Sequence, residues 1–97
     1  MSYLKEEEML YIDIGIRIRK LRLARGLTQL EFSKRIALSR PSVTNIENGV
    51  HKVSLISLYH ICKVLKVCIY DLLPENVGKI SRKRHTNNED DSRQMAE

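Results

Sequence analysis

The stretch TQLEFSKRIALSRPSVTNIENG, residues 28–49, decides the fold of this chain. Its apolar residues occupy the inward positions of two short helical segments, which are separated by a break at Ala37. These inward residues are Phe32, Ile36, Leu38, Val43 and Ile46. Polar residues face outward between them, and the small Ser33 lies where two helices need to approach closely. The division predicts a helix-turn-helix, a motif whose second helix lies in the major groove of DNA.

Capping residues set the boundaries of the two helices. Thr28 is a suitable N-cap for the first helix, because Glu31 three residues later completes a capping box. Ser39 can cap the second helix, but Arg40 is also a candidate cap because the residue before a proline avoids the helical region. The Asn-Gly pair at residues 48–49 is typical of a helix end. Both helices are therefore expected to be short and sharply bounded.

A helical stripe also precedes the helix-turn-helix. Ile14, Ile18 and Leu21 repeat at intervals of four and three residues, which predicts a core-facing helix over about residues 11–25. Gly26 then ends this helix in the manner of a C-terminal glycine.

Two more helices are expected after the helix-turn-helix, and no strand alternation of useful length occurs. Ser54 can cap the fourth helix, and a short fifth helix at about residues 69–73 precedes Pro74. The expected inward residues of the fourth helix are Leu55, Leu58, Ile61, Cys62 and Leu65. The fold class is therefore all-α, with five helices and the helix-turn-helix formed by the second and third.

Three regions are expected along the chain. Residues 1–10 are a loose N-terminal segment, and residues 11–77 form the helix-turn-helix DNA-binding domain. Residues 78–97 form a charged tail with too few apolar residues to order itself, so we expect it to be disordered.

Positive charge is concentrated on the segment that holds the helix-turn-helix. The net charge is +5, and residues 14–52 carry nine basic groups against two acidic ones. Residues 1–13 are instead acidic, with a net charge of −3. A solvated basic face is one interpretation, but a surface that faces DNA phosphates is favoured because charge and motif coincide.

Composition excludes several other classes of protein. No apolar run is long enough to span a bilayer, and the acidic start is unlike a signal peptide, so a cytoplasmic location without membrane contact is expected. The two cysteines, Cys62 and Cys68, are expected to be reduced thiols in neither a metal site nor a disulfide framework. No nucleophile–His–acid set, paired carboxylates or glycine-rich phosphate loop is present, so we expect no catalysis, cofactor or metal.

Three stretches resemble the lambda-repressor/Cro-like family, also called the XRE-type helix-turn-helix family. They are IRKLRLARGLTQ (residues 18–29), SRPSVTNIENG (residues 39–49) and SLISLYHICKVLKVCIYDLL (residues 54–73). The resemblance implies a homodimeric DNA-binding transcriptional regulator, usually a repressor, on a palindromic operator. The chain departs from the family at Ala37, where Gly is usual, at Ser33, where Ala is usual, and at Val53, where Pro is common.

The recognition helix, residues 39–48, supplies the candidate base contacts. Its outward side chains are Arg40, Pro41, Ser42, Thr44 and Asn45. Arg suits guanine, Asn suits adenine, and the proline ring could touch a thymine methyl. Each of these residues has a plainer interpretation as a phosphate contact, a conformational element or a solvated side chain.

A second set of residues is expected to contact the DNA backbone, which positions the protein without specifying sequence. These phosphate candidates are Arg22, Thr28, Gln29, Ser39, Asn48, His51, Lys52 and Ser54. The family resemblance implies that Arg22 also pairs with Glu47, as a structural ion pair that fixes the recognition helix.

Apolar residues left over from the internal stripes are candidates for a dimer interface, with buried core as the alternative for each. They are Ile56, Tyr59, Val64, Ile69, Tyr70 and Leu73. A competing function is a protein-interaction module, such as an antitoxin or adaptor, that holds a partner through the tail and through Leu23 and Leu30. A restriction–modification controller would look the same at this level.

Overall fold

The computed structural model describes residues 2–74, which form four α-helices and one short 3-10 helix. The elements are α1 (Ser2–Ala24), α2 (Gln29–Arg35), α3 (Arg40–Glu47), α4 (Leu55–Leu65) and η1 (Ile69–Leu72). The described part is therefore all-helical, but the expected count of five α-helices is not confirmed. The fifth segment is a single 3-10 turn, because Pro74 follows too closely for an α-helix to continue. The predicted tail, residues 78–97, lies outside the described residues.

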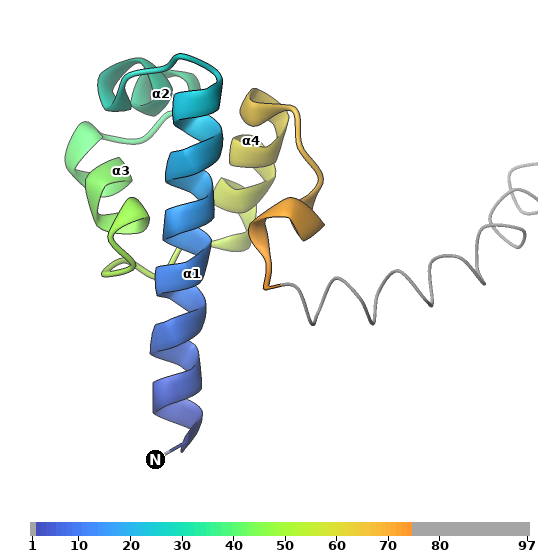
Figure 1. Ribbon diagram of the computed structural model, residues 1–97. Helices are drawn as coiled ribbons and strands as arrows, with labels where there is room; N and C mark the ends of the chain where they lie inside the picture. The colour runs from blue at the N-terminus through green and yellow to red at the C-terminus, as the bar shows by residue number, and fades with distance from the viewer. Residues whose placement is uncertain (1, 75–97) are drawn as a thin grey trace, which may run out of the picture.

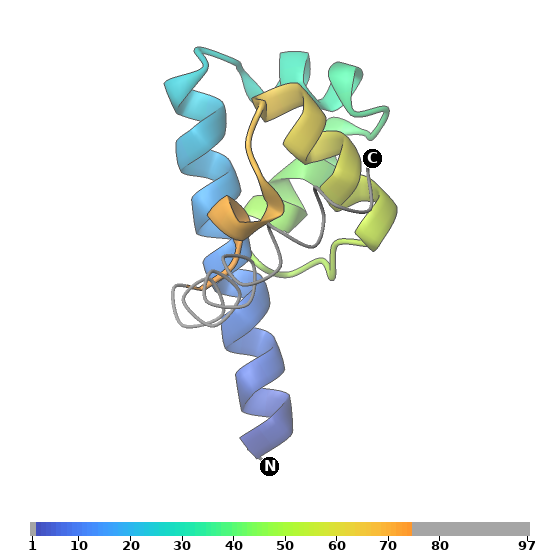
Figure 2. The same cartoon turned by 90° about the vertical axis from the view of Figure 1, so that its right-hand side faces the viewer.

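The long helix α1 runs through the middle of the fold. The pair α2–α3 packs on one side of it, and α4 with η1 packs on the other (Figure 1). Its N-terminal turns extend past the other helices, which is also clear in the perpendicular view of Figure 2. The prediction that residues 1–10 are loose was wrong from Ser2 onward. Lys, Glu, Met and Leu favour a helix, and no proline or glycine interrupts the chain before Gly15.

The core lies between these helices and follows the predicted apolar stripes. Its most enclosed side chains are Ile18, Phe32, Val43, Ile61, Leu65 and Leu72. Leu21, Leu38 and Cys62 pack only partly against this core. Leu55 was expected to point inward but is 75% exposed, because it begins α4 at an outer corner of the fold.

The crossing of α1 over α3 depends on Gly15. A Cβ atom at this position would lie 2.6 Å from the carbonyl oxygen of Glu47 and would also collide with that of Ile46. Only a glycine lets the two backbones come this close. Arg22, two turns further along α1, is thereby brought within reach of α3.

The turn between α2 and α3 has a left-handed residue at Ala37, whose φ is +59°. This conformation costs a residue with a Cβ atom roughly 1–2 kcal/mol, which explains why glycine is usual there in the family it resembles. The backbone N–H of Leu38 donates to the carbonyl oxygen of Ser33 at 3.0 Å and closes the turn. The buried Ser33 hydroxyl donates to Leu30 O at 2.7 Å, so this polar group is satisfied between the helices.

Across residues 2–74, no helix is both long enough and apolar enough to pass through a membrane.

Candidate nucleic-acid interface

The N-terminal end of α3 is presented to solvent. Ser39 is the N-cap, and its hydroxyl oxygen accepts a hydrogen bond from the backbone N–H of Ser42 at 3.2 Å. Arg40 is therefore the first residue of the helix, and Pro41 occupies its first turn, where no N–H is required. The side chains of Arg40, Pro41 and Asn45 are exposed, as a base-reading surface requires.

The other two candidate base contacts are half-buried and already have partners. The hydroxyl of Ser42 lies 2.9 Å from that of Ser39. The hydroxyl of Thr44 lies 2.9 Å from Gln29 Oε1 and 3.2 Å from the carbonyl oxygen of Arg40. Of the five predicted base contacts, Arg40, Pro41 and Asn45 are therefore the most accessible to DNA.

A hydrogen-bonded chain joins the start of α2 and the C-terminal half of α3 to α1. The Gln29 amide accepts from Thr44 through Oε1 and donates through Nε2 to Glu47 Oε1 at 3.1 Å. Arg22 donates from Nε to Glu47 Oε2 at 2.6 Å and from Nη2 to Glu47 Oε1 at 3.1 Å. Its Nη1 donates to the carbonyl oxygen of Leu27 at 2.7 Å. The expected Arg22–Glu47 ion pair is thus formed, in a two-pronged geometry that fixes both partners.

This ion pair is buried, and that determines its energetics. The Arg22 and Glu47 side chains are 7% and 2% exposed. Charges removed from water to this extent need full hydrogen bonding to be tolerated, and the network supplies it. No buried side-chain polar atom lacks a partner among residues 5–74. The pair therefore acts as a strut that sets the position of α3 against α1.

Three phosphate candidates stand at helix starts, where backbone N–H groups point outward. Thr28 caps α2 in the predicted capping box, and both its backbone N–H and its hydroxyl engage Glu31. Hydrogen bonds from the Thr28 backbone and then its side chain lower the pKa of Glu31. Ser39 and Ser54 cap α3 and α4 in the same way, and both are exposed.

The loop after α3 carries three further phosphate candidates, Asn48, His51 and Lys52, all of them exposed. Lys52 has a partner that the sequence did not indicate, because its Nζ lies 2.7 Å from Glu7 Oε2. The hydrogen bond and the charge of Glu7 raise the pKa of Lys52. Glu7 had been assigned to a loose segment, so this contact could be found only once α1 was known to extend that far.

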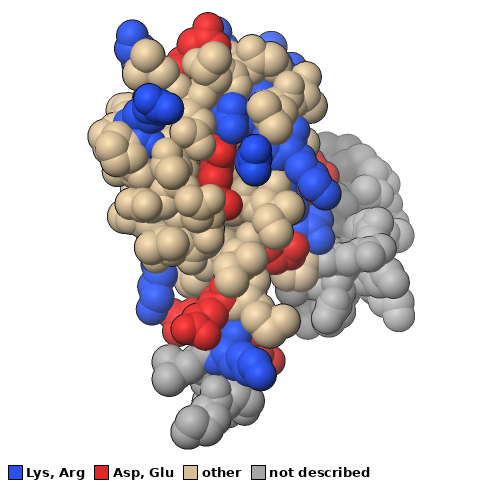
Figure 3. Space-filling model, turned by 60° about the vertical axis from the view of Figure 1, so that its left-hand side comes forward, with Lys and Arg blue, Asp and Glu red and all other residues tan. Residues whose placement is uncertain are grey.

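Basic side chains are unevenly distributed over the side of the molecule that carries α2 and α3. Figure 3 shows this side with Lys and Arg most numerous in its upper half and along one edge, and with acidic side chains at the top, at the centre and below. The upper part corresponds to the level of α2, as comparison with Figure 1 shows. This agrees with the positive charge of residues 14–52 and the negative charge of residues 1–13.

The candidate dimer residues divide into two groups. Val64, Ile69 and Leu73 pack partly against the core. Ile56, Tyr59 and Tyr70 are exposed, by 61%, 56% and 42%. An apolar groove runs along α4 to η1, and its lining is Leu55, Ile56, Tyr59, Cys62 and Ile69. Leu55, which had been assigned to the core, thus belongs to this surface.

Comparison with known proteins agrees with the helix-turn-helix geometry. A model of the HTH_3 family, described as helix-turn-helix, matches residues 18–72. The antitoxin PezA of Streptococcus pneumoniae serotype 4 is 38% identical over 63 residues, which is 65% of this chain and 40% of PezA. An uncharacterized HTH-type transcriptional regulator of Archaeoglobus fulgidus is 36% identical over 56 residues, 58% of this chain and 80% of that protein.

A solved structure shares the fold over a similar stretch. The restriction-modification controller protein C.AhdI of Aeromonas hydrophila superposes with a TM-score of 0.63 at 30% identity, covering 65% of this chain and 96% of that one. The chain spans less than half the length of PezA. The part of α1 before residue 18 lies outside the family match.

Proposed function

This chain belongs to the HTH_3 family of helix-turn-helix DNA-binding regulators, and on that premise we propose that it is a sequence-specific transcriptional repressor that binds a palindromic operator as a homodimer. The observation that carries the proposal is the exposed start of α3, held in place by the buried Arg22–Glu47 strut. A rigid helix with free polar side chains at its leading end is what base reading in a major groove requires.

Individual roles follow from the exposure of each side chain. Arg40 reads guanine through a forked pair of hydrogen bonds, and Asn45 reads adenine. Pro41 contacts a thymine methyl between them. Ser42 and Thr44, whose short side chains are half-buried, contact bases at the edge of the helix. The DNA backbone is held by Thr28, Ser39 and Ser54 at helix starts and by Asn48, His51 and Lys52 in the loop. Gln29 and Arg22, the other two phosphate candidates, have their side chains engaged within the protein and instead support the recognition helix.

A homodimer is needed because one recognition helix reads only a few base pairs. Two half-sites are then expected about 34 Å apart, one turn of DNA. The exposed apolar surface of α4 supports this proposal, since Ile56, Tyr59 and Tyr70 are large, apolar and more than a third exposed. Such aromatic and branched side chains are typical anchors of an interface core.

The central experiment is a salt titration of binding to the DNA upstream of the chain's own gene. Affinity should fall steeply with salt concentration and should exceed that for random DNA by at least about 10³-fold. Arg40→Gln should reduce this preference for one base pair by about 1–3 kcal/mol, while binding to random DNA should fall only by the effect of one lost charge. Equal affinity for both DNAs, or no dependence on salt, would contradict the proposal.

The oligomeric state is tested separately by sedimentation equilibrium. Wild-type protein should behave as a dimer, and Tyr59→Asp should shift it to monomer while leaving its helical content unchanged. Lys66→Gln, at the exposed C-terminal end of the same helix, changes the net charge by the same amount and is the control. A wild-type protein that stays monomeric at micromolar concentration would exclude the homodimer.

The similarity to an antitoxin favours one alternative, a protein-interaction module that holds a partner protein. Leu23 and Leu30 are 54% and 50% exposed and offer apolar contacts away from α4. Purification from the native host should then yield a partner in fixed stoichiometry, which is lost on Leu23→Ser or on deletion of residues 78–97. A controller of restriction–modification is distinguished by the presence of a methyltransferase gene next to its operator.

A further inference from the structure

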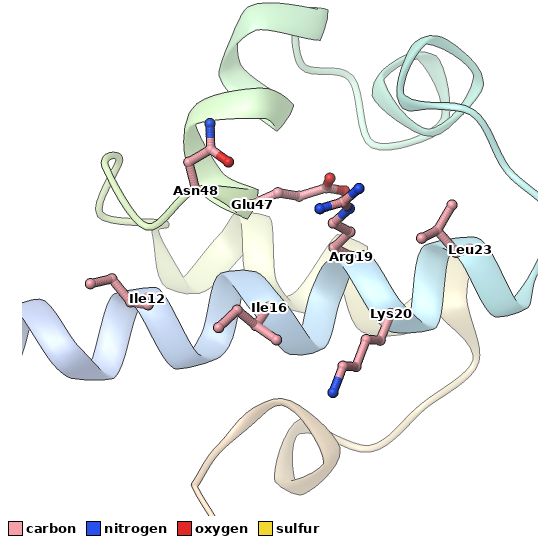
Figure 4. Close-up of a pocket in the computed structure, with 7 residues that line it drawn as sticks. All are labelled: Ile12, Ile16, Arg19, Lys20, Leu23, Glu47 and Asn48. Carbon is pink, nitrogen blue, oxygen red and sulfur yellow. The ribbon is translucent and has the colours of Figure 1, made fainter.

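A hollow lies where α1 passes the C-terminal end of α3, and its polar lining includes Arg19, Lys20 and Asn48 (Figure 4). Figure 4 shows Arg19 rising from α1 toward α3, with Asn48 beyond it at the end of that helix. Arg19, Lys20 and Asn48 are all exposed. Among these three, only Asn48 had been considered as a DNA contact.

The position of this hollow follows from the length of α3. The helix has eight residues, so it is about 12 Å long at about 1.5 Å per residue. The major groove of B-DNA is about 12 Å wide. When the N-terminal end of α3 meets the base edges, its C-terminal end and the adjoining face of α1 therefore lie near a groove edge, where the phosphates are.

The charge available at this edge comes from Arg19 and not from Arg22. Arg22 is buried and donates three N–H groups within the protein. Glu47 also lines the hollow, but Arg22 neutralises its charge at 2.6 Å. The three ion pairs formed by side chains 5–74 include neither Arg19 nor Lys20. An exposed guanidinium that forms none of these ion pairs and lies beside a neutralised carboxylate is suited to a phosphate.

We infer that Arg19 binds a DNA phosphate in this hollow, together with the amide of Asn48, so that α1 grips the backbone beside the recognition helix. The inference rests on the proposed function and names a contact outside the helix-turn-helix. The methyl groups of Ile12, Ile16 and Leu23 line the same hollow and would pack against sugar carbons, which keeps water from the ion pair.

Arg19→Gln tests the inference, and Arg17→Gln is the matched control. Both variants remove one positive charge from α1, two residues apart, but Arg17 already pairs with Asp13 at 3.1 Å. Arg19→Gln should reduce the slope of log affinity against log salt by about 0.9. When salt is raised from about 50 to 200 mM, the variant should therefore lose about threefold less affinity than the wild type. This difference should be the same for operator and random DNA. Arg19→Lys should restore most of the slope.

The outcomes separate this inference from the proposed function. If Arg17→Gln lowers the slope as much as Arg19→Gln, the effect is one of overall charge and the Arg19 contact is wrong, while specific wild-type binding keeps the proposed function. If wild-type protein shows no salt-dependent preference for its upstream DNA, both fail together. Thermal unfolding should be unchanged in both Arg19 variants, because the Arg19 side chain is exposed. Arg17→Gln should change it little, because the Arg17–Asp13 pair is partly exposed to water.

Discussion

Two ion pairs join α1 to α3 and to the loop that follows it. Their N–O distances are nearly equal, but one pair is buried and the other is exposed to water. Arg22 and Glu47 meet at 2.6 Å with side chains 7% and 2% exposed. Lys52 and Glu7 meet at 2.7 Å with side chains 67% and 40% exposed. The separation of the charges is therefore not what distinguishes the pairs. Water is excluded from one pair and surrounds the other, which makes the first a fixed part of the fold and the second readily exchangeable.

The difference in burial gives the two ion pairs different roles. The buried pair positions α3 and cannot release Arg22 without leaving the Glu47 charge unpaired in the interior. The exposed pair holds Lys52 loosely, so a phosphate can replace Glu7 at little cost in free energy. Breaking the first pair is therefore expected to affect mainly stability, and breaking the second mainly the availability of Lys52 for a DNA phosphate.

The largest effect is expected from breaking the buried pair. Glu47→Ala leaves the Arg22 charge uncompensated in the interior and should lower the free energy of unfolding by about 3–5 kcal/mol. Urea denaturation followed by circular dichroism measures the change. Glu47→Gln also leaves the Arg22 charge uncompensated and keeps only one of the two accepting oxygens, so it should still destabilise the fold strongly. A loss below about 1 kcal/mol for Glu47→Ala would mean that the pair behaves like a surface pair.

A somewhat smaller effect is expected from separating the two helices that carry the buried pair. Gly15→Ala should destabilise the fold by about 1–3 kcal/mol, because the new methyl group meets backbone atoms of α3. The preference of alanine for helices, worth about 1 kcal/mol, offsets part of this loss. Chemical denaturation gives the value. A gain in stability would show that the crossing can widen without harm to the strut.

Breaking the exposed Lys52–Glu7 pair should affect DNA binding and have little effect on stability. Glu7→Gln should leave stability nearly unchanged and should strengthen DNA binding at low salt, since Lys52 becomes free for a phosphate. Fluorescence anisotropy with labelled DNA measures the affinity. Glu8→Gln removes the same charge from the next residue, which forms none of the three ion pairs of side chains 5–74. Equal gains from both variants would show a general effect of charge instead.

The smallest effect concerns Glu31, an exposed carboxylate held mainly by hydrogen bonds to Thr28. Its pKa is lowered in the folded protein, first by the backbone N–H of Thr28. Its contribution to stability is therefore present above the ordinary Glu pKa of about 4.3 and is lost as the pH falls through the lowered value. Glu31→Gln should flatten the dependence of the melting temperature on pH in that acidic range. If Glu31→Gln leaves the dependence of the melting temperature on pH unchanged, Glu31 does not contribute to that dependence.

Local patterns in the sequence predicted much of the fold and of the site. Thr28 and Glu31 formed the expected capping box, and Arg22 and Glu47 formed the pair that the family resemblance implied. The start of α1 was missed because charge alone suggested a loose segment, although nothing in it breaks a helix. Gly15 did carry a signal, since an isolated glycine in a helical pattern often marks a close packing contact.

Contacts between distant residues were beyond local patterns. The Glu7–Lys52 pair depends on the length of α1 and on the path of the loop after α3 together, and neither follows from spacing. Leu55 fitted the stripe of α4 by its interval, but the stripe does not indicate where the neighbouring helices end. Partial burial of Thr44 likewise depends on Gln29, fifteen residues earlier in the chain.

The Gln29 amide limits which substitutions are tolerated at positions 29 and 44. Its two ends are different, one accepting from Thr44 and the other donating to Glu47. A Glu at this position would set two like carboxylates against each other, and a Val in place of Thr44 would leave the amide oxygen without its partner. A substitution of Thr44 therefore also disturbs Gln29, and we expect the two positions to tolerate change only together.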